Sequence, residues 1–551
     1  MEKDQALNRQ DRLKRLEETM FDVLVIGGGI TGAGIALDAA TRGLKTALIE
    51  MQDFAAGTSS RSTKLVHGGL RYLKQFEVKM VAEVGKERAI VYENGPHVTT
   101  PEWMLLPFYQ GGTFGAFTTS IGLRVYDFLA GVKREERRKM LSKEAALDKE
   151  PLLRREGMKG GGYYVEYRTD DARLTIEVMK QAVEAGAAVA NYVKAEELLY
   201  EDGKLVGVIA GDCAVDGGTY RIKARKVVNA TGPWVDTLRE QDHSKKGKTL
   251  RLTKGVHLVF DGRRFPLRQA IYFDTPDKRM VFAIPRDGKT YVGTTDTDYD
   301  GDKAHPHISS EDRDYLLRAI DGLFPGLGLG PQDVESGWAG LRPLIYEEGK
   351  SPSEVSRKDE IFVSPSGMIT IAGGKLTGYR RMAETVTDLL VRELVGAGVA
   401  SEFGPCVTRT LPISGGDVAG GSKGFPAYVR SMTEEGMRLG LSEAAAERLA
   451  RRYGSNAKAV FARVPDRQGR GYGLPAEAEA ELLYSIEEEM TLKPVDFFVR
   501  RTGALFFDIA WVREWKESVI ELMADKLGYS EEQVRQYTEE LEREFGLAFA
   551  E

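Results

Sequence analysis

The sequence contains little cysteine and no long apolar run. Cys213 and Cys406 are the only cysteines among 551 residues, and their spacing matches no metal-binding pattern. This scarcity argues against a disulfide framework or a cysteine cluster, so we expect no metal site and a reducing compartment. No apolar run approaches the roughly 20 residues that span a bilayer. Residues 1–20 mix acids and bases without an apolar core, so we predict no signal peptide and a cytoplasmic protein.

An excess of positive charge is also absent. The chain carries 77 basic and 83 acidic residues, and its net charge of −6 argues against a nucleic-acid partner. Hydrophobic residues make up 42% and charged residues 29% of the chain, the balance of a soluble globular protein. A chain of 551 residues is long enough for two or three domains with a sizeable core.

A glycine-rich turn near the N-terminus is the most informative local pattern. The apolar run 21–26 predicts a strand, and the turn Gly27-Gly28-Gly29-Ile30-Thr31-Gly32 leads from it into a predicted helix over 30–42. Glu50 ends the next apolar run, 47–49. Strand, glycine turn, helix, strand and acid form the pattern of a dinucleotide-binding βαβ unit.

The residues of this unit have separate physical roles. Gly27 permits a tight turn, Gly29 lets the backbone approach a pyrophosphate, and Gly32 lets the helix pack closely on the strand. The pyrophosphate is expected at the helix N-terminus, where free N–H groups and the helix dipole favour negative charge. We expect Glu50 to accept hydrogen bonds from both ribose hydroxyls. The motif alone leaves FAD and NAD open as ligands.

Two later turns favour FAD. Stretches of α/β and antiparallel pattern are interleaved after the βαβ unit, and no second nicotinamide-type motif follows. Ala230-Thr231-Gly232 ends a predicted strand. In flavoproteins of the two-dinucleotide type, an Ala-Thr-Gly turn at this position leads the chain back past the FAD. Gly373-Gly374-Lys375-Leu376-Thr377 forms a strand-to-helix turn. Its N–H groups can face the flavin N1–C2=O edge and favour the reduced flavin, although a plain glycine turn is the alternative.

Six motifs resemble those of one family and occur in that family's order. The chain is similar to the FAD-dependent glycerol-3-phosphate dehydrogenases at residues 58–73 (Thr-Ser-Ser-Arg-Ser-Thr-Lys-Leu-Val-His-Gly-Gly-Leu-Arg-Tyr-Leu), 229–234, 254–257, 293–296, 340–344 and 373–380. The resemblance covers essentially the whole chain. Two positions depart from the family pattern. Gly378 stands where the family often has a hydroxyl residue, and Arg61 stands where it commonly has a small one.

The resemblance implies a cofactor site. The expected FAD-binding residues are Gly27, Gly29, Ile30, Thr31, Gly32, Glu50, Thr58, Ser59, Ser60, Lys64, Leu65, His67, Gly68, Gly69, Val193, Ala230, Thr231, Gly232, Trp234, Gly373, Gly374, Lys375, Leu376 and Thr377.

The expected fold is an α/β FAD-binding fold of the two-dinucleotide type with an inserted, mixed and largely antiparallel β-sheet substrate domain. We expect residues 1–404 to form this part, with the substrate region roughly at 76–160 and 250–365. The pattern over 76–160 predicts mostly helix. Residues 405–551 are predicted to form a helical C-terminal domain, with the boundary near Gly404-Pro405.

The resemblance implies oxidation of sn-glycerol 3-phosphate to dihydroxyacetone phosphate, with FAD as the hydride acceptor. Arginine suits such a substrate because its planar fork offers several donors to a phosphate dianion. By resemblance, Arg71, Arg342 and Lys375 serve both substrate binding and catalysis, and Tyr72 and Arg357 complete the substrate pocket. A surface ion pair is the alternative reading for any one of these arginines.

Loss of the C2 hydroxyl proton requires a base, and neutral imidazole is the usual base near pH 7. The chain has six histidines. His257 lies in a strand-like motif of the family, and we expect it to act as the base or to orient the hydroxyl. His67, in the predicted flavin loop, is the second candidate. For either residue, a core histidine that only holds the sheet is the alternative.

By resemblance, the electrons pass to a membrane quinone, so we expect a cytoplasmic protein that is peripheral on the inner face of the cell membrane. Residues 114–129 and 497–511 are candidate membrane-contacting stretches, with core-facing helices as the alternative. A homodimer is one of the open oligomeric states.

Three alternatives stay open for function: a glycerophosphate oxidase that uses oxygen, a flavin-dependent amino or 2-hydroxy acid oxidoreductase, and a non-catalytic FAD-binding protein.

Overall fold

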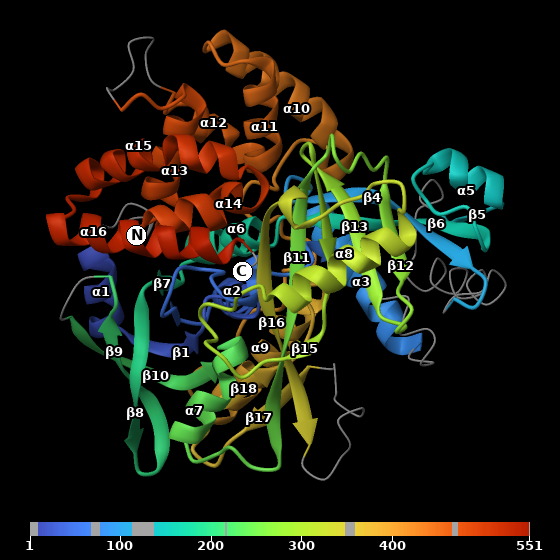
Figure 1. The fold of residues 1–551 in the computed structure, drawn as a ribbon. Coiled ribbons are helices and arrows are strands. Elements are labelled where there is room, and N and C mark those ends of the chain that lie inside the picture. The colour runs from blue at the N-terminus through green and yellow to red at the C-terminus, as the bar shows by residue number, and fades with distance from the viewer. Residues whose placement is uncertain are drawn as a thin grey trace.

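The computed structural model contains two large β-sheets and a group of helices, coloured orange to red in Figure 1, that forms the C-terminal part of the chain. It describes residues 9–67, 78–112, 137–214, 218–347, 359–464 and 472–549.

The first sheet has a parallel core that continues the predicted βαβ unit. Its strands follow the order β17-β18-β10-β1-β2-β7, and an antiparallel β8–β9 ribbon extends from β10. All neighbours from β18 to β7 run parallel, whereas β17 is antiparallel to β18. The strands are β1 (Met20–Ile26), β2 (Thr46–Ile49), β7 (Ala188–Ala190), β8 (Val193–Glu201), β9 (Lys204–Asp212), β10 (Thr219–Asn229), β17 (Glu360–Val363) and β18 (Ile369–Ala372).

Helices α1, α2, α6 and α9 pack around this sheet. Helix α2 (Ile30–Thr41) is predicted within one residue and lies against α6 (Asp171–Glu184) and α9 (Tyr379–Gly396). Ala33, Ala36 and Ala40 in α2 are buried in the shared core. Their small side chains let neighbouring helices approach closely. Helix α1 (Arg9–Glu18) precedes the sheet and packs on β10.

The second sheet is antiparallel except where β12 lies parallel to β4. Its path is β15-β11-β14-β13-β12-β4-β6-β3, with β16 on β11 and β5 on β6. The strands are β3 (Leu65–Val66), β4 (Thr99–Tyr109), β5 (Lys139–Leu141), β6 (Met158–Thr169), β11 (Lys248–Asp261), β12 (Ala270–Asp274), β13 (Met280–Arg286), β14 (Lys289–Gly293), β15 (Thr297–Asp298) and β16 (Val334–Glu347).

The two faces of this sheet are covered by different parts of the chain. Val256 and Leu258 pack with Leu316 and Ile320 of helix α8 (Ser310–Leu323). The other face contributes Trp338 to a core that it shares with the C-terminal helices. The sheet is therefore buried on both sides, and the C-terminal helices contribute directly to its core.

The expectation of a mostly helical stretch over 76–160 is wrong in part. Helix α3 (Val78–Asn94) and the short α5 (Lys143–Lys149) are present, but β4 and the start of β6 also lie in this range. Leu105 faces the α8 side of the sheet, whereas Met104 and Leu106 face the C-terminal side. A strand that is buried on both faces shows no alternation of apolar and polar residues, so periodicity cannot separate it from a helix.

The C-terminal part is helical, as predicted. Its helices are α10 (Gly421–Arg438), α11 (Glu443–Tyr453), α12 (Ala457–Phe461), α13 (Ala476–Glu488), α14 (Ala504–Phe507), α15 (Ile509–Leu527) and α16 (Glu531–Leu547), with a π-helical turn at Asp496–Arg501. Local chemistry explains the starts of α11 and α16. Ser442 caps α11, and Ser530 forms a capping box with Gln533 at the start of α16.

The prediction that residues 497–511 contact a membrane is wrong for the first half of this stretch. Phe497 and Phe498 are fully buried in the core, and the side chains of Arg500 and Arg501 form buried ion pairs. This segment therefore offers no apolar surface to a bilayer. The other stretch, 114–129, lies outside the described residues. Within the part of the chain that the structure describes, no helix has the length and apolarity needed to cross a membrane.

Candidate active site

A deep cleft lies at the carboxyl ends of the parallel strands. Its free space, out to the opening, is about 1520 Å³. Segments far apart in the sequence line it, among them the glycine turn after β1, Glu50 after β2 and the turns after β10 and β18. Ligands of open α/β sheets bind in this position. The predicted residues that line the cleft are Gly27, Gly29, Ile30, Thr31, Glu50, Thr58, Ser59, Val193, Ala230, Thr231, Gly232, Trp234, Gly373, Gly374, Lys375 and Leu376.

The glycine turn has the geometry that its roles require. Gly27 adopts φ +116°, and a Cβ there would lie 2.5 Å from the carbonyl oxygen of Ala230. A Cβ on Gly32 would lie 1.9 Å from the carbonyl oxygen of Gly27, so α2 packs closely on the strand. Gly28 was not among the predicted site residues. It is also constrained, though less tightly, because its Cβ would lie 2.8 Å from the Cβ of Glu50.

Replacing Gly32 with alanine is expected to lower the free energy of unfolding by about 1–3 kcal/mol or more, because the added methyl group forces α2 away from the turn. Urea unfolding of both proteins measures this difference. Gly322 in α8 provides the control, since a Cβ there meets nothing within 4 Å and alanine should be neutral or slightly stabilising. An unchanged unfolding midpoint for Gly32→Ala would contradict the tight-packing role.

Glu50 is held in place by backbone donors. Its Oε2 accepts a hydrogen bond from the N–H of Gly28 at 2.6 Å, and its Oε1 accepts one from Gln52 at 2.8 Å. Burial raises the pKa of Glu50, while these two hydrogen bonds oppose the rise. Each carboxylate oxygen can accept a second hydrogen bond. Glu50 thus keeps the acceptor capacity that a ribose diol requires.

Residues 50–64, here called the cofactor segment, form one wall of the cleft. Within it, Ser59 Oγ accepts from the Ile30 N–H at 2.9 Å, and Thr58 Oγ1 donates to the Leu341 carbonyl at 2.8 Å. Ser60 and Lys64 do not line the cleft: the Lys64 ammonium is buried between the Ser60 carbonyl and Asp171. Leu65 follows in β3, and its side chain joins the core. Ser60, Lys64 and Leu65 therefore lie on the side of the wall that faces away from the cleft, and they support it there.

His67 lies beside the turn that follows β18. Thr377 Oγ1 donates to the His67 carbonyl at 3.3 Å. Burial lowers the pKa of His67 to about 4, with further lowering by Lys375 and Arg88, so its imidazole is neutral near pH 7. Five predicted residues lie outside the described residues: Gly68, Gly69, Arg71, Tyr72 and Arg357.

His257 and Arg342 lie on the same face of the second sheet. In the register of β11 and β16, His257 is opposite Trp338 and Thr253 is opposite Arg342. Positions of the same parity on paired strands share a face. A Cβ on Gly255, between these positions on β11, would lie 2.2 Å from Arg342 Nη2. The absence of a side chain at this position makes room for the guanidinium.

Arg342 is oriented by the segment after β14. Its Nη2 donates to Thr294 Oγ1 at 2.7 Å, and its Nη1 donates to the Thr295 carbonyl at 3.1 Å and pairs with Asp296 at 3.3 Å. The Arg342 side chain remains 32% exposed. The next residue, Pro343, lines the cleft together with Lys375.

His257 is enclosed by aromatic and polar neighbours. Its Nε2 lies 3.0 Å from Thr63 Oγ1, and its ring stacks on Trp338 with centroids 4.7 Å apart. Burial lowers the pKa of His257 well below its ordinary value, with further lowering by Arg342 and Lys64. Its buried Nδ1 has no hydrogen-bond partner among the described residues. The imidazole is therefore neutral near pH 7, the form in which it can accept a proton.

Arg380 has a structural role, because its guanidinium is fully engaged in buried ion pairs. This arginine ends the last family motif, and its guanidinium forms a two-pronged pair with Glu87 of α3 at 2.6 and 2.7 Å. It also contacts Glu384 one turn along α9. Burial opposes the charged form, but Glu87 and Glu384 raise the pKa of Arg380 overall. The pair ties α9 to α3.

This fold and this cleft are those of a nucleotide-binding oxidoreductase. Residues 22–380 match the family model described as FAD dependent oxidoreductase, and residues 406–534 match the C-terminal domain of alpha-glycerophosphate oxidase. The chain therefore belongs to the FAD-dependent oxidoreductase family, and the predicted fold and the cofactor, FAD, are confirmed. The structure offers what FAD needs: a glycine turn free of side chains, an acceptor at Glu50, and backbone N–H groups in the turn after β18.

Close relatives narrow the family. The aerobic glycerol-3-phosphate dehydrogenase of Bacillus subtilis is 64% identical over 98% of this chain and 97% of its own length. The Staphylococcus epidermidis protein of the same name is 59% identical over 98% and 96%. Within the oxidoreductase family, the chain thus belongs with the aerobic glycerol-3-phosphate dehydrogenases.

Solved structures agree with this assignment. The glycerol-3-phosphate dehydrogenase of Bacillus halodurans, solved in complex with FAD, superposes with a TM-score of 0.85. It is 51% identical and covers 98% of this chain and 97% of that chain. The L-alpha-glycerophosphate oxidase of Mycoplasma pneumoniae has a TM-score of 0.54 at 19% identity over 68% and 95%, so it shows a shared fold alone.

Proposed function

We propose that this protein oxidises sn-glycerol 3-phosphate to dihydroxyacetone phosphate, with FAD as the hydride acceptor. The observation that carries the proposal is the arrangement of His257 and Arg342 on one sheet face, where the residue after Arg342 lines the FAD cleft beside Lys375. The names of the full-length relatives point to the same substrate.

The proposed roles follow from side-chain chemistry. Arg342 presents a planar fork to the phosphate, and Lys375 adds a second positive charge at the cleft. His257 accepts the C2 hydroxyl proton as the C2 hydrogen leaves with its electron pair. Bound FAD supplies the site that accepts this hydride. Arg71, Tyr72 and Arg357 stay predicted members of the substrate pocket.

Anaerobic mixing of the FAD-loaded protein with glycerol 3-phosphate tests the reaction. The flavin absorbance should bleach within the turnover time. Lactate and glycine should leave it unchanged, because they lack the phosphate that Arg342 and Lys375 are proposed to bind. Bleaching by lactate or glycine alone would reassign the substrate to a hydroxy or amino acid. No bleaching by any of the three compounds would favour a non-catalytic FAD-binding protein.

A membrane quinone is the proposed acceptor of the electrons. The protein is accordingly proposed to bind peripherally at the inner face of the cell membrane. Its proposed assembly is a homodimer. The match of residues 406–534 to an oxidase domain keeps oxygen as the second candidate acceptor. After substrate bleaching, the absorbance should recover rapidly with a soluble quinone and slowly with oxygen. Fast recovery in oxygen with release of peroxide would establish the oxidase.

A further inference from the structure

The cofactor segment contacts two different environments. Its inner side lines the FAD cleft through residues such as Glu50, Thr58 and Ser59. Its outer side meets the C-terminal helices at Asp53 and Arg61, both of which are buried. Each of these residues forms ion pairs with side chains more than 400 positions later in the chain. The C-terminal part therefore holds the cleft wall at two points.

Asp53 is the first point of attachment. Its carboxylate accepts hydrogen bonds from Arg500 Nε at 2.6 Å and from Arg501 Nη1 and Nη2 at 2.8 and 3.0 Å. Asn191 donates a further bond at 2.9 Å. Burial raises the pKa of Asp53, but Arg501 and Arg500 outweigh this effect and lower it to about 2. The carboxylate is thus charged, fully buried and fully paired.

The π-helical turn lets two consecutive arginines reach this one carboxylate. The Thr502 N–H donates to the carbonyl of Phe497, five residues earlier, at 2.9 Å. Side chains of consecutive residues in an α-helix diverge by about 100°, and a π-turn changes this local spacing. Arg501 also donates to the Glu489 carbonyl at 2.8 Å, which fixes its direction.

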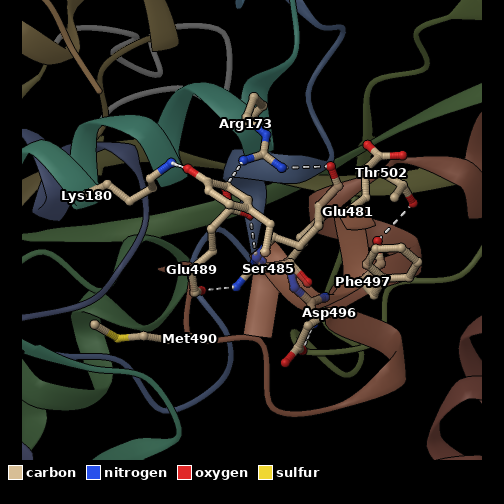
Figure 2. Close-up of polar contacts among 12 residues, drawn as sticks. Arg173, Lys180, Glu481, Ser485, Glu489, Met490, Asp496, Phe497 and Thr502 are labelled. Carbon is tan, nitrogen blue, oxygen red and sulfur yellow. Dashed lines mark hydrogen bonds and ion pairs between the residues drawn. The ribbon is translucent and has the colours of Figure 1, made fainter. Parts of the chain in front are cut away.

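Further buried polar contacts hold the π-turn itself (Figure 2). Arg173 of α6 pairs with Glu489 and donates to the Arg501 carbonyl at 3.0 Å. Lys180, two turns along α6, donates to the same Glu489 carboxylate at 3.3 Å. Arg501, one of the two arginines that hold Asp53, is therefore fixed both by α6 and by Glu489.

Arg61 is the second point of attachment, and its pairing accounts for a cation at a position where the family commonly has a small residue. Arg61 Nη2 pairs with Glu544 of α16 at 3.0 Å, and the side chains are only 7% and 8% exposed. His305 Nδ1 lies 3.0 Å from the other oxygen of Glu544. Burial raises the pKa of Glu544, but Arg61 and His305 lower it to about 2. The adjacent Ser62 lines the cleft.

We propose that Glu544, Arg500 and Arg501 are positioning residues for FAD: through Arg61 and Asp53, the C-terminal helices hold the cofactor segment in its FAD-binding conformation. None of the three is among the residues that line the cleft, so they act through the segment. The inference concerns cofactor affinity and does not depend on the identity of the substrate.

The test compares two glutamates on one helix. Glu544→Gln removes the charge that faces Arg61, whereas Glu540→Gln, one turn earlier, removes a pair with Lys493 that does not contact the cofactor segment. FAD binding to the full-length apoprotein is measured by quenching of flavin fluorescence. We expect Glu544→Gln to weaken FAD binding about tenfold or more and Glu540→Gln to leave it unchanged. Saturating FAD should restore the wild-type kcat of Glu544→Gln.

A double-mutant cycle keeps the proposal testable if one variant folds poorly. Arg61→Gln should weaken FAD binding as Glu544→Gln does, the double variant should be no weaker than either single variant, and Arg61→Lys should recover most of the affinity. Wild-type FAD affinity in Glu544→Gln would overturn the proposal. Additive losses in the double variant, or an equal loss in Glu540→Gln, would do the same.

Discussion

Replacing Arg342 with glutamine should lower kcat/KM for glycerol 3-phosphate by about 100-fold or more, because the phosphate loses a two-pronged, charge-assisted contact. The guanidinium is already aligned by Thr294, the Thr295 carbonyl and Asp296. Its binding to phosphate thus requires little ordering of the side chain, and the loss should appear mainly as an increase in KM. Steady-state kinetics over a wide substrate range measures it.

A second arginine on the same strand pair provides the control. Arg251 of β11 pairs with Asp298 in an exposed ion pair, so Arg251→Gln should leave kcat and KM within about a factor of two. FAD content should be the same in both variants, since neither residue lines the cleft or takes part in the two attachments of the cofactor segment. An Arg342→Gln enzyme with wild-type KM and kcat would remove Arg342 from the substrate pocket.

Replacing His257 with asparagine should lower kcat by about 10²–10⁴-fold, the usual contribution of a general base. Asparagine keeps a hydrogen-bonding group near Thr63 but cannot accept a proton. His243 is exposed, so His243→Asn is the control and should retain full activity. Single-turnover bleaching of the flavin by substrate isolates this step from reoxidation. Near-normal bleaching in His257→Asn, with loss in His67→Asn, would assign the base to His67.

The pH dependence of the wild-type enzyme follows from the lowered pKa of His257. Its ordinary value is 6.5, and burial moves it well below that. Only the neutral ring accepts a proton. After correction for the titration of the substrate phosphate, kcat/KM should therefore stay flat through pH 6.5 and fall at more acidic pH, when the ring becomes protonated. A decline centred at or above pH 6.5 would contradict this account, because it would require an imidazole with an ordinary or raised pKa.

The C-terminal helices show why one sequence-based expectation, a membrane-contacting stretch at 497–511, differs from the structure. The run Phe497-Phe498 with Arg500 and Arg501 has the composition of a membrane-contacting face, since two basic residues directly follow three apolar ones. In the fold, the phenylalanines enter the core and the arginines pair with Asp53. Composition does not reveal such pairing, because the partner lies in another domain.

Local patterns were sufficient for the cofactor cleft. The roles of Gly27 and Gly32 depend on contacts within one βαβ unit, and the turns at 230–232 and 373–376 depend on strand ends that periodicity detects. These residues meet at the cleft as expected. Ser60, Lys64 and Leu65 have instead a supporting position behind the wall. Adjacent residues of a loop can face opposite sides, and sequence spacing does not decide which side each one takes.

The sequence by itself determined the class of cofactor site, because glycine turns, strand periodicity and the acid after β2 are short-range features. Only the tertiary structure decided the alignment of His257 with Arg342, which depends on the register of β11 against β16. It also decided the attachment of Arg61 to Glu544, which are 483 residues apart. The first contact depends on which residues of two strands pair, and the second joins residues far apart in the chain, so no local pattern specifies either of them.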